Sequence, residues 1–283
     1  MKNRADGVRV NANNPMYEII PYIMDKRYDS QNMVTLDIPV GPMDDFLRQK
    51  RREGTPLSHL ALVICAYLRA TAEYPALNRF VVNRRIYARK EFTVGMVVLK
   101  PGVDQGTMNK MFLELTDDVF DVQRKIDAYV AENRQTGDHN KTDDIMAKLL
   151  RFPALCGFIV NILKWADLHN LLPKSVIDAS PFHESLVITN LASIRTNHIY
   201  HHLYEFGTVS LIVAMGNLRE VAKRVNGTVE HVRCLPLGCV MDERICSGSY
   251  YALCFSRIRA YLADPSLMVG PPKVVHNEAA GVE

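Results

Sequence analysis

The sequence predicts an α/β protein, because apolar strand patterns and apolar helix patterns both occur along it. Residues 209–216 form an apolar run of strand length. Residues 58–74 are apolar around most of a helix circumference, so this helix is predicted to be buried on nearly all sides. Residues 235–240 form another buried strand, which leads into a polar turn and then into a helix that opens near Ser249. We expect the rest of the chain to be organised around this strand, turn and helix.

The first half of the chain alternates strands and helices. Residues 33–38 alternate apolar and polar side chains, which predicts a strand. A helix begins at Pro42 and ends near Arg52. Residues 80–87 predict two strands joined by an Asn-Arg turn, and residues 92–99 predict another strand.

The second half shows the same mixture of elements. Residues 101–108 predict a turn-rich link, and residues 185–191 predict a strand. Asn226-Gly227 predicts a hairpin turn. The remaining predicted elements are a strand at 111–115, a helix at 119–134 capped by Asp117 and Asp118, a loop at 135–142, and helices at 143–150 and 152–169. The apolar side chains of the last two helices predict a core or a subunit contact.

Composition sets the broad class. The 283 residues carry a net charge of +3, with 48% apolar and 23% charged residues, which is typical of a globular protein with a substantial core. So small a charge argues against nucleic acid as a partner. No apolar run reaches the roughly 18 residues of a membrane span, and the start of the chain lacks a signal-peptide pattern. Reduced thiols and a cytoplasmic location are expected, because the cysteines lie mostly in apolar elements without metal-ligand spacing: Cys65, Cys156, Cys234, Cys239, Cys246 and Cys254.

Three parts of the chain are predicted. Residues 1–32 are polar and irregular and form an N-terminal extension, in which residues 16–24 are compatible with a short helical packing segment. Residues 33–268 form one domain. Residues 269–283 are rich in proline, glycine and charge, which predicts a disordered tail.

The polar turn after residue 240 is the main candidate site. Asp242, Glu243, Arg244 and Ser247 stand at the mouth of the turn between two apolar elements, and Gly248 suits a crowded position or one with positive φ. Two interpretations stand side by side. The turn is either an ordinary strand-to-helix connection with solvated charges or a functional site at a strand end.

Residues 242–248 read Asp-Glu-Arg-Ile-Cys-Ser-Gly. They resemble the end of the catalytic domain of dihydrolipoamide acyltransferases and chloramphenicol acetyltransferases, where a strand ends in Asp-His-Arg-x-x-Asp-Gly or His-His-x-x-x-Asp-Gly. Glu243 occupies the histidine position and Ser247 the second aspartate position. The buried helix, Pro-x-x-Asn element, hairpin and strand of residues 58–99 are similar to the same family. So are residues 187–192, Val-Ile-Thr-Asn-Leu-Ala, in which Thr189 occupies a serine position.

The resemblance covers residues 30–268 and implies a two-layer mixed β-sheet sandwich with helices, like chloramphenicol acetyltransferase. It implies a homotrimer with an active channel between subunits, or a larger cage of trimers. It further implies coenzyme A or acyl-coenzyme A as substrate and a small-molecule acceptor. Catalytic roles fall on Glu243, Thr189 and Ser247, and the turn itself is shaped by Asp242, Arg244 and Gly248. No lipoyl group on this chain and no metal site are expected.

Two functional hypotheses follow. In the first, the protein is an acyltransferase in which Glu243 replaces the histidine base and Thr189 donates a hydrogen bond to the oxyanion. In the second, it is a non-catalytic trimeric scaffold or acyl-coenzyme A-binding relative that lost the base, and Glu243 pairs with Arg244 or another cation. A displaced histidine base is a further alternative within the first hypothesis, and its candidates are His201 and His202, with His198 upstream of them, and His183.

Overall fold

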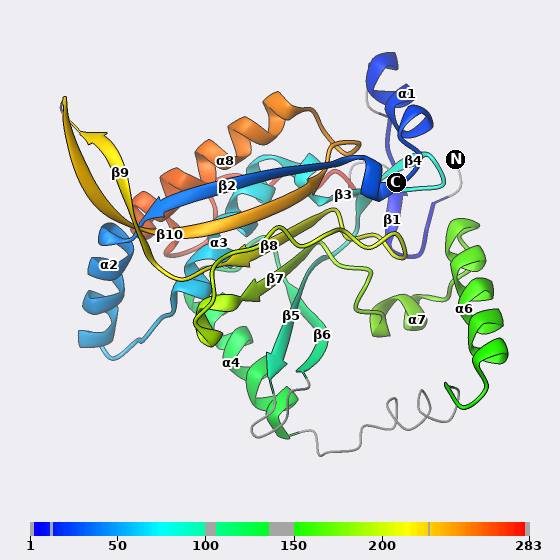
Figure 1. Ribbon diagram of the computed structural model, residues 1–283, viewed down its shortest axis with the longest axis horizontal. Helices are drawn as coiled ribbons and strands as arrows, with labels where there is room; N and C mark the ends of the chain where they lie inside the picture. The colour runs from blue at the N-terminus through cyan, green and yellow to red at the C-terminus, as the bar shows by residue number, and fades with distance from the viewer. Residues whose placement is uncertain (1–2, 12–13, 100–105, 136–149, 226, 281–283) are drawn as a thin grey trace.

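A mixed sheet places the end of β10 beside an edge strand. The computed structural model describes residues 3–11, 14–99, 106–135, 150–225 and 227–280. In these residues the main sheet has the order β2-β10-β8-β7-β5-β6, and β9 pairs with β10 (Figure 1). Neighbours β5, β7 and β8 are parallel, and the other pairs are antiparallel. The strands are β2 (Gln31–Pro39), β5 (Phe92–Leu99), β6 (Gly106–Leu113), β7 (Leu186–Asn190), β8 (Leu211–Met215), β9 (Arg219–Val225) and β10 (Thr228–Asp242).

A second, smaller sheet ties the N-terminal segment to the domain. Strand β1 (Gly7–Arg9) pairs with β4 (Arg85–Arg89), which pairs with β3 (Arg79–Val82). The β3–β4 turn is formed by Asn83 and Arg84, both with positive φ, 48° and 60°. This is the backbone of a tight hairpin turn whose twist matches the flanking strands.

One face of the main sheet is covered by helices, which make the principal core (Figure 1). Helix α3 begins after Ser58, whose Oγ accepts from the backbone N–H of Ala61 at 3.1 Å. Most of α3 is buried, because it lies between the sheet and its helical neighbours. The helices on this side are α2 (Gly41–Arg52), α3 (His59–Glu73), α4 (Val119–Gln135) and α8 (Gly248–Ala263).

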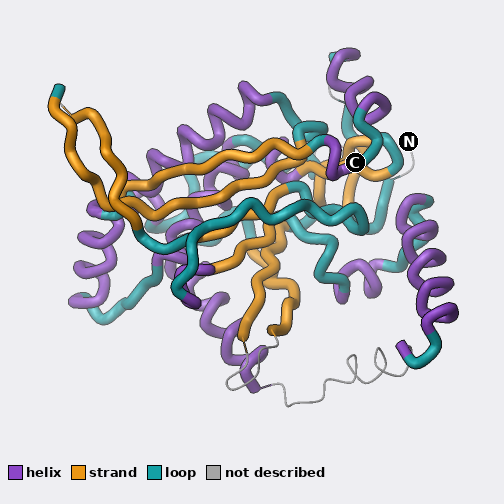
Figure 2. Tube along the Cα trace, viewed as in Figure 1, coloured by secondary structure: helices purple, strands orange, loops and turns teal. Residues whose placement is uncertain are grey.

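The opposite face is covered by the loop between β7 and β8, drawn in teal in Figure 2. Two glycines let this loop lie directly on the sheet. A Cβ on Gly238 would lie 2.3 Å from the carbonyl oxygen of Ile199, and one on Gly216 would lie 2.2 Å from the backbone nitrogen of His198. Leu203 then packs against the strands in a small second core.

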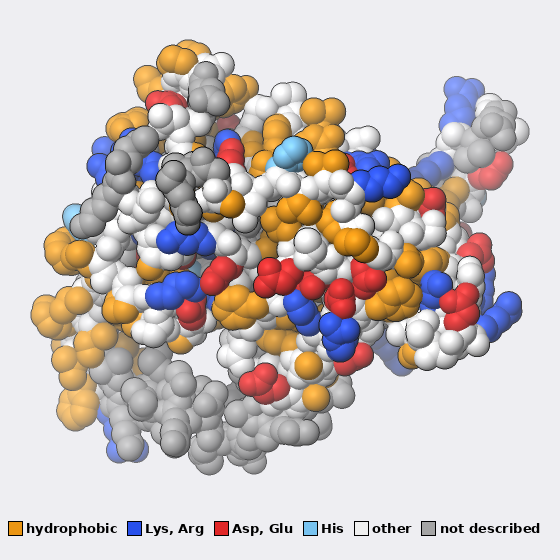
Figure 3. Space-filling model, turned by 180° about the vertical axis from the view of Figure 1, so that it is seen from behind, with side chains coloured by type: hydrophobic (Ala, Val, Ile, Leu, Met, Phe, Trp, Pro, Cys, Tyr) orange, Lys and Arg blue, Asp and Glu red, His pale blue; other side chains and the backbone are white. Residues whose placement is uncertain are grey.

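Three helices lie at one edge of the molecule: α1 (Pro15–Ile23), α6 (Pro153–Leu168) and α7 (Lys174–Ala179). Figure 3 shows hydrophobic side chains gathered at the edge that carries α6. Phe158 is 63% exposed and Trp165 is 55% exposed. Within the described residues, no helix is both long and apolar enough to cross a membrane. Four short 3-10 helices complete the chain, at Arg27–Asp29, Pro75–Asn78, Leu191–Ile194 and Pro265–Met268.

The predicted α/β class, the mixed sheet with helices and most element positions are confirmed. The link predicted at 101–108 is shorter than expected, because β6 already begins at Gly106. The helix predicted at 143–150, the loop at 135–142 and residues 101–105 fall almost wholly outside the described residues. The sequence did not predict the two cores, the order of the strands in the sheet or their register.

The described segments near both ends of the chain pack on the domain. The short helical segment expected at 16–24 is present as α1, and β1 is an addition to the expected irregular extension. Residues 269–280 lie against the body, although we predicted a disordered tail. Arg79 Nε donates to Glu278 Oε2 at 2.7 Å, and the His276 N–H donates to the Ala72 carbonyl at 2.8 Å. Tertiary contacts of this kind leave no trace in local composition.

Replacing Gly238 with alanine should detach the β7–β8 loop. The new Cβ meets a backbone carbonyl rather than a flexible side chain, so we expect a loss of about 1–3 kcal/mol in the free energy of unfolding. Gly157→Ala is the matched control, because nothing lies within 4 Å of its Cβ position in α6. That change should stabilise the protein by up to about 1 kcal/mol. Urea denaturation measures both, and equal effects would contradict the close approach.

Candidate functional site at the end of β10

The turn after β10 is a short connection between a buried strand and a buried helix. Strand β10 ends at Asp242, and α8 begins at Gly248. Ser247 caps α8, because its Oγ accepts from the Tyr250 N–H at 3.2 Å. Gly248 is exposed, has no positive φ, and a Cβ there would meet nothing within 4 Å. The expectation that this glycine answers crowding or positive φ is therefore wrong.

Asp242 is the centre of a buried ionic cluster. Its side chain is fully buried and accepts hydrogen bonds from Arg244 Nε at 2.8 Å and Nη2 at 2.7 Å. Ser30 Oγ donates to it at 2.9 Å, and Arg27 Nε lies 3.6 Å away. Burial raises the pKa of Asp242, but the hydrogen bonds and charge of Arg244, with the charge of Arg27, outweigh it and hold this pKa below its usual value. The carboxylate is therefore ionised at neutral pH.

Arg27 joins three separate segments to this cluster. Its guanidinium donates to the carbonyl oxygens of Tyr204 at 2.6 Å, Glu205 at 3.3 Å and Val81 at 3.1 Å. The β7–β8 loop, the β3–β4 hairpin and the end of β10 thus share one buried cation. This arrangement fixes their positions around the turn.

Glu243 carries a carboxylate with no cation bound to it. It is half-buried, and its backbone N–H donates to the Ser30 carbonyl at 2.9 Å. Its side chain accepts a hydrogen bond from the Asn32 amide. Arg244 pairs with Asp242 instead, and no described residue forms an ion pair with Glu243. The predicted alternative of a Glu243–Arg244 ion pair is therefore wrong.

Thr189 lies near the end of β7, and its hydroxyl is half-buried without a hydrogen-bond partner among the described residues. It pairs in register with Ala214 on β8, which pairs with Gly238 on β10. Gly238 precedes Glu243 by five residues, or about 16 Å at roughly 3.3 Å per residue. With β8 also between them, Thr189 and Glu243 of one chain do not meet in one cavity.

The three accessory histidines lie in two places. His183 is buried at the far end of β7, with Nδ1 2.7 Å from Ser180 Oγ and Nε2 3.3 Å from Asp167 Oδ1. It is therefore far from Thr189, which it precedes closely in the sequence. His201 and His202 stack on each other, with ring centroids 5.0 Å apart, in the loop that covers the sheet.

His198 lies upstream of His201 and His202 in the β7–β8 loop, the segment in which the sequence suggested a displaced histidine base. Its Nε2 lies 3.0 Å from Thr35 Oγ1, and its Nδ1 is buried without a partner. Burial, and next the charge of Arg219, lower the pKa of His198, and Asp37 opposes them. The imidazole rests over Gly238, in the same row of the sheet as Thr189.

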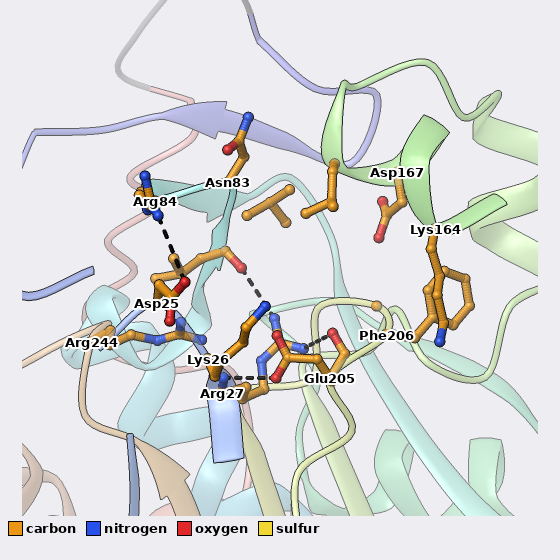
Figure 4. Close-up of a pocket in the computed structure, with 14 residues that line it drawn as sticks. Asp25, Lys26, Arg27, Asn83, Arg84, Lys164, Asp167, Glu205, Phe206 and Arg244 are labelled. Carbon is orange, nitrogen blue, oxygen red and sulfur yellow. Dashed lines mark hydrogen bonds and ion pairs between the residues drawn. The ribbon is translucent and has the colours of Figure 1, made fainter. Parts of the chain in front are cut away.

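Beside the ionic cluster lies a cleft of about 440 Å³ (Figure 4). Arg27 and Arg244 of the cluster line it, together with parts of the N-terminal segment, the β3–β4 turn, α6 and the β7–β8 loop. Sequence reasoning missed it because no spacing along the chain links these segments. The adjacent basic residues Lys26 and Arg27 were the one local feature of the sequence that indicated a cationic site here. In the described residues, no group of His, Cys, Asp or Glu is arranged to hold a metal ion.

Comparison with known proteins identifies the fold. No family model matches the sequence, and no curated protein matches it. The structure is similar to the dihydrolipoamide acetyltransferase of Azotobacter vinelandii, with a TM-score of 0.59, 12% identity and coverage of 90% of this chain and 88% of that one. It is similar to the cubic core of a pyruvate dehydrogenase multienzyme complex, with a TM-score of 0.56, 14% identity and coverage of 90% and 88%. It is also similar to a chloramphenicol acetyltransferase, with a TM-score of 0.54, 10% identity and coverage of 90% and 99%.

The chain therefore has the acyltransferase fold of dihydrolipoamide acetyltransferase cores and chloramphenicol acetyltransferase. The resemblance predicted from the strand, turn and helix at 235–262 is confirmed at the level of the fold. At 10–14% identity the likeness establishes the architecture. The chemistry has to be argued from this chain's own residues.

Replacing Asp242 with asparagine should strongly destabilise the protein. It would leave Arg27 and Arg244 buried without their shared carboxylate, which costs about 3–5 kcal/mol of unfolding free energy. Because the folded pKa of Asp242 is lowered, its contribution is present above the unfolded pKa near 4 and lost as pH falls through the folded pKa. The variant should therefore lose less stability on acidification than the wild type, as urea denaturation across pH 2–6 would measure. Asp37→Asn, which breaks a surface ion pair with Arg219, should cost less than about 1 kcal/mol.

Proposed function

We propose that this protein transfers an acyl group from acyl-coenzyme A to a thiol, hydroxyl or amine acceptor, with Glu243 as general base. The observation that carries the proposal is the environment of the Glu243 carboxylate. Its carboxylate is half-exposed at the end of β10 and is bound by the neutral Asn32 amide rather than by a cation. No cation among the described residues occupies this carboxylate, so an acceptor could approach it.

The site would form between copies of the chain. Glu243 and Thr189 of one chain are too far apart to act on one carbonyl, whereas a ring of identical subunits brings the two ends of neighbouring chains together. Glu243 lies beside β2, an edge strand of the sheet. Exposed apolar side chains flank that edge: Tyr28 is 65% exposed and Met33 is 53% exposed. Such residues are typical of contacts between proteins, and we propose a homotrimer, alone or as the unit of a larger cage.

In the reaction, the acceptor's proton moves to the Glu243 carboxylate as the acceptor attacks the thioester carbonyl carbon. The Thr189 hydroxyl of the neighbouring copy donates a hydrogen bond to the resulting oxyanion. The carbon–sulfur bond then breaks, and the coenzyme A thiolate takes the proton back from Glu243. Asp242, Arg244 and the Ser247 cap hold the turn that carries the base.

A non-catalytic role is the alternative, and one observation favours it. The Asn32 amide binds the Glu243 carboxylate that would have to take the acceptor's proton. An ordinary glutamate lies about 4 pKa units below a thiol, which is close to 6 kcal/mol of unfavourable proton transfer. In this alternative the trimer binds acyl-coenzyme A without turnover. All six cysteines are free, which fits the cytoplasmic location we propose for either function.

Replacing Glu243 with glutamine should abolish release of free coenzyme A from acyl-coenzyme A, because the amide cannot accept the acceptor's proton. A thiol-reactive dye assayed with a panel of acyl thioesters and acceptors measures this release. Glu230→Gln, at an exposed position on β10, is the matched control and should retain wild-type rates. If the wild type releases no thiol with any pair, or Glu243→Gln matches it, the protein is not an acyltransferase of this kind.

Mixing two inactive variants tests whether the site is shared. Thr189→Ala should lower kcat by about 10²–10³ through loss of the oxyanion hydrogen bond. When Glu243→Gln and Thr189→Ala chains are unfolded together and reassembled, roughly one site in four of a cyclic oligomer contains both native residues. We therefore expect activity to return in the mixture. A mixture as inactive as its parents would show that the two residues do not act across chains.

A further inference from the structure

We propose that the cleft beside the Asp242 cluster binds a small molecule that carries one anionic head group, a carboxylate or a phosphate, on a short apolar body. This site does not depend on acyl transfer at Glu243. The cleft volume of about 440 Å³ is within the usual range for small-molecule sites. Figure 4 shows its walls, which come from segments far apart in the sequence.

The acidic groups of the cleft are already paired. Of the three carboxylates that line it, Asp25 lies 3.7 Å from Arg84, and Asp167 accepts from Arg4 at 2.7 Å. The Glu205 carboxylate accepts from the backbone N–H of Arg27 at 2.8 Å. The arginine partners offset the charges of Asp25 and Asp167, and the charge of Glu205 acts on Arg27 and Arg244.

More basic than acidic side chains line the cleft. The floor holds Arg27, 3% exposed, and Arg244, 5% exposed, and these two guanidinium groups share one buried carboxylate, Asp242. Arg27 Nε has no hydrogen-bond partner. Burial lowers the pKa of Arg27, and the charge of Asp242 raises it. The charge of Arg244 lowers it and those of Glu205 and Asp167 raise it, with a net lowering. An anion in the cleft would add a further favourable charge interaction with this buried guanidinium.

Two lysines line opposite walls of the cleft. Lys26 follows α1, and Lys164 lies in the last turns of α6. Both are exposed, and neither forms an ion pair with any residue in the described ranges. A carboxylate or phosphate held between them gains charge-assisted hydrogen bonds with little rearrangement of the buried cluster.

The remaining wall is apolar. Val81 and Val82 come from β3, Leu168 from α6, and Phe206 from the β7–β8 loop. Gly207 holds this loop in place with φ at 89°, where a Cβ would lie 2.0 Å from the Phe182 carbonyl oxygen. An apolar wall beside a cationic floor matches an anion with a short hydrocarbon body rather than a bare ion.

Binding of defined probes to the full-length protein tests the proposal. Isothermal titration with octanoate and with octyl phosphate should show saturable binding at one site per chain. Each affinity should fall as salt increases, because the lysines are at the surface. Octanol lacks the charge and inorganic phosphate lacks the apolar body, so both should bind at least roughly tenfold more weakly than octyl phosphate. A difference between octanoate and octyl phosphate identifies which head group the cleft prefers.

Single substitutions locate the site. Lys26→Ala and Lys164→Ala should each weaken binding of the better probe by roughly tenfold, the usual effect of losing one charge-assisted contact. Lys273→Ala, at an exposed position outside the cleft, should have no effect. Glu243→Gln should also leave probe binding unchanged, so the cleft and the acyl-transfer proposal can fail separately. Trp165, the single tryptophan, follows Lys164 and reports binding through its fluorescence.

Three outcomes would overturn the proposal. One is absence of saturable binding by both octyl probes. Another is octanol binding as tightly as they do, which would mean apolar adsorption. The third is equal loss of affinity in Lys273→Ala and in the two cleft variants, which would mean nonspecific attraction by surface charge.

Discussion

Ion pairs between two arginines and one buried aspartate set the geometry of the turn between β10 and α8. A carboxylate that is fully removed from water must be paired, and Asp242 is paired by Arg244 from its own turn and by Arg27 from the N-terminal segment. Since Arg27 also binds the β7–β8 loop and the β3–β4 hairpin, one charge cluster aligns four segments. The half-buried carboxylate of Glu243 forms no ion pair with a described residue, because its buried neighbour takes the cations.

The two faces of the main sheet are used differently. The helix face carries nearly all of the apolar core, and it supplies most of the stability. The other face is covered by a loop in which the polar residue His198 rests over Gly216 and Gly238. A face covered by a loop rather than by a helix can hold polar groups close to the sheet, because loop side chains and water can satisfy them. Thr189 lies on this second face, in the row of Gly238.

The cleft and the motif turn share Arg244, yet they present different chemistry. In the two proposals, Glu243 would accept a proton at the turn, while the adjacent cleft would bind an anion. A ligand that neutralises Arg27 or Arg244 would change the electrostatic field on Asp242, and through it the turn that positions Glu243. The proposed transfer site and the proposed anion site are therefore connected by a single buried cluster.

Local chemistry determined the elements of this chain. The apolar circumference of 58–74 and the Asn83-Arg84 turn predicted structure that depends on neighbours in sequence, and both are present. The motif at 242–248 pointed to the fold, because strand, turn and helix lie within one short segment. Only the tertiary structure decided that Arg244 binds Asp242 and leaves Glu243 without a cation, that Thr189 and Glu243 of one chain stay apart, and that Lys26 and Lys164 face one cleft. Those outcomes depend on pairings between residues far apart along the chain, and burial sets their energies, which no local pattern encodes.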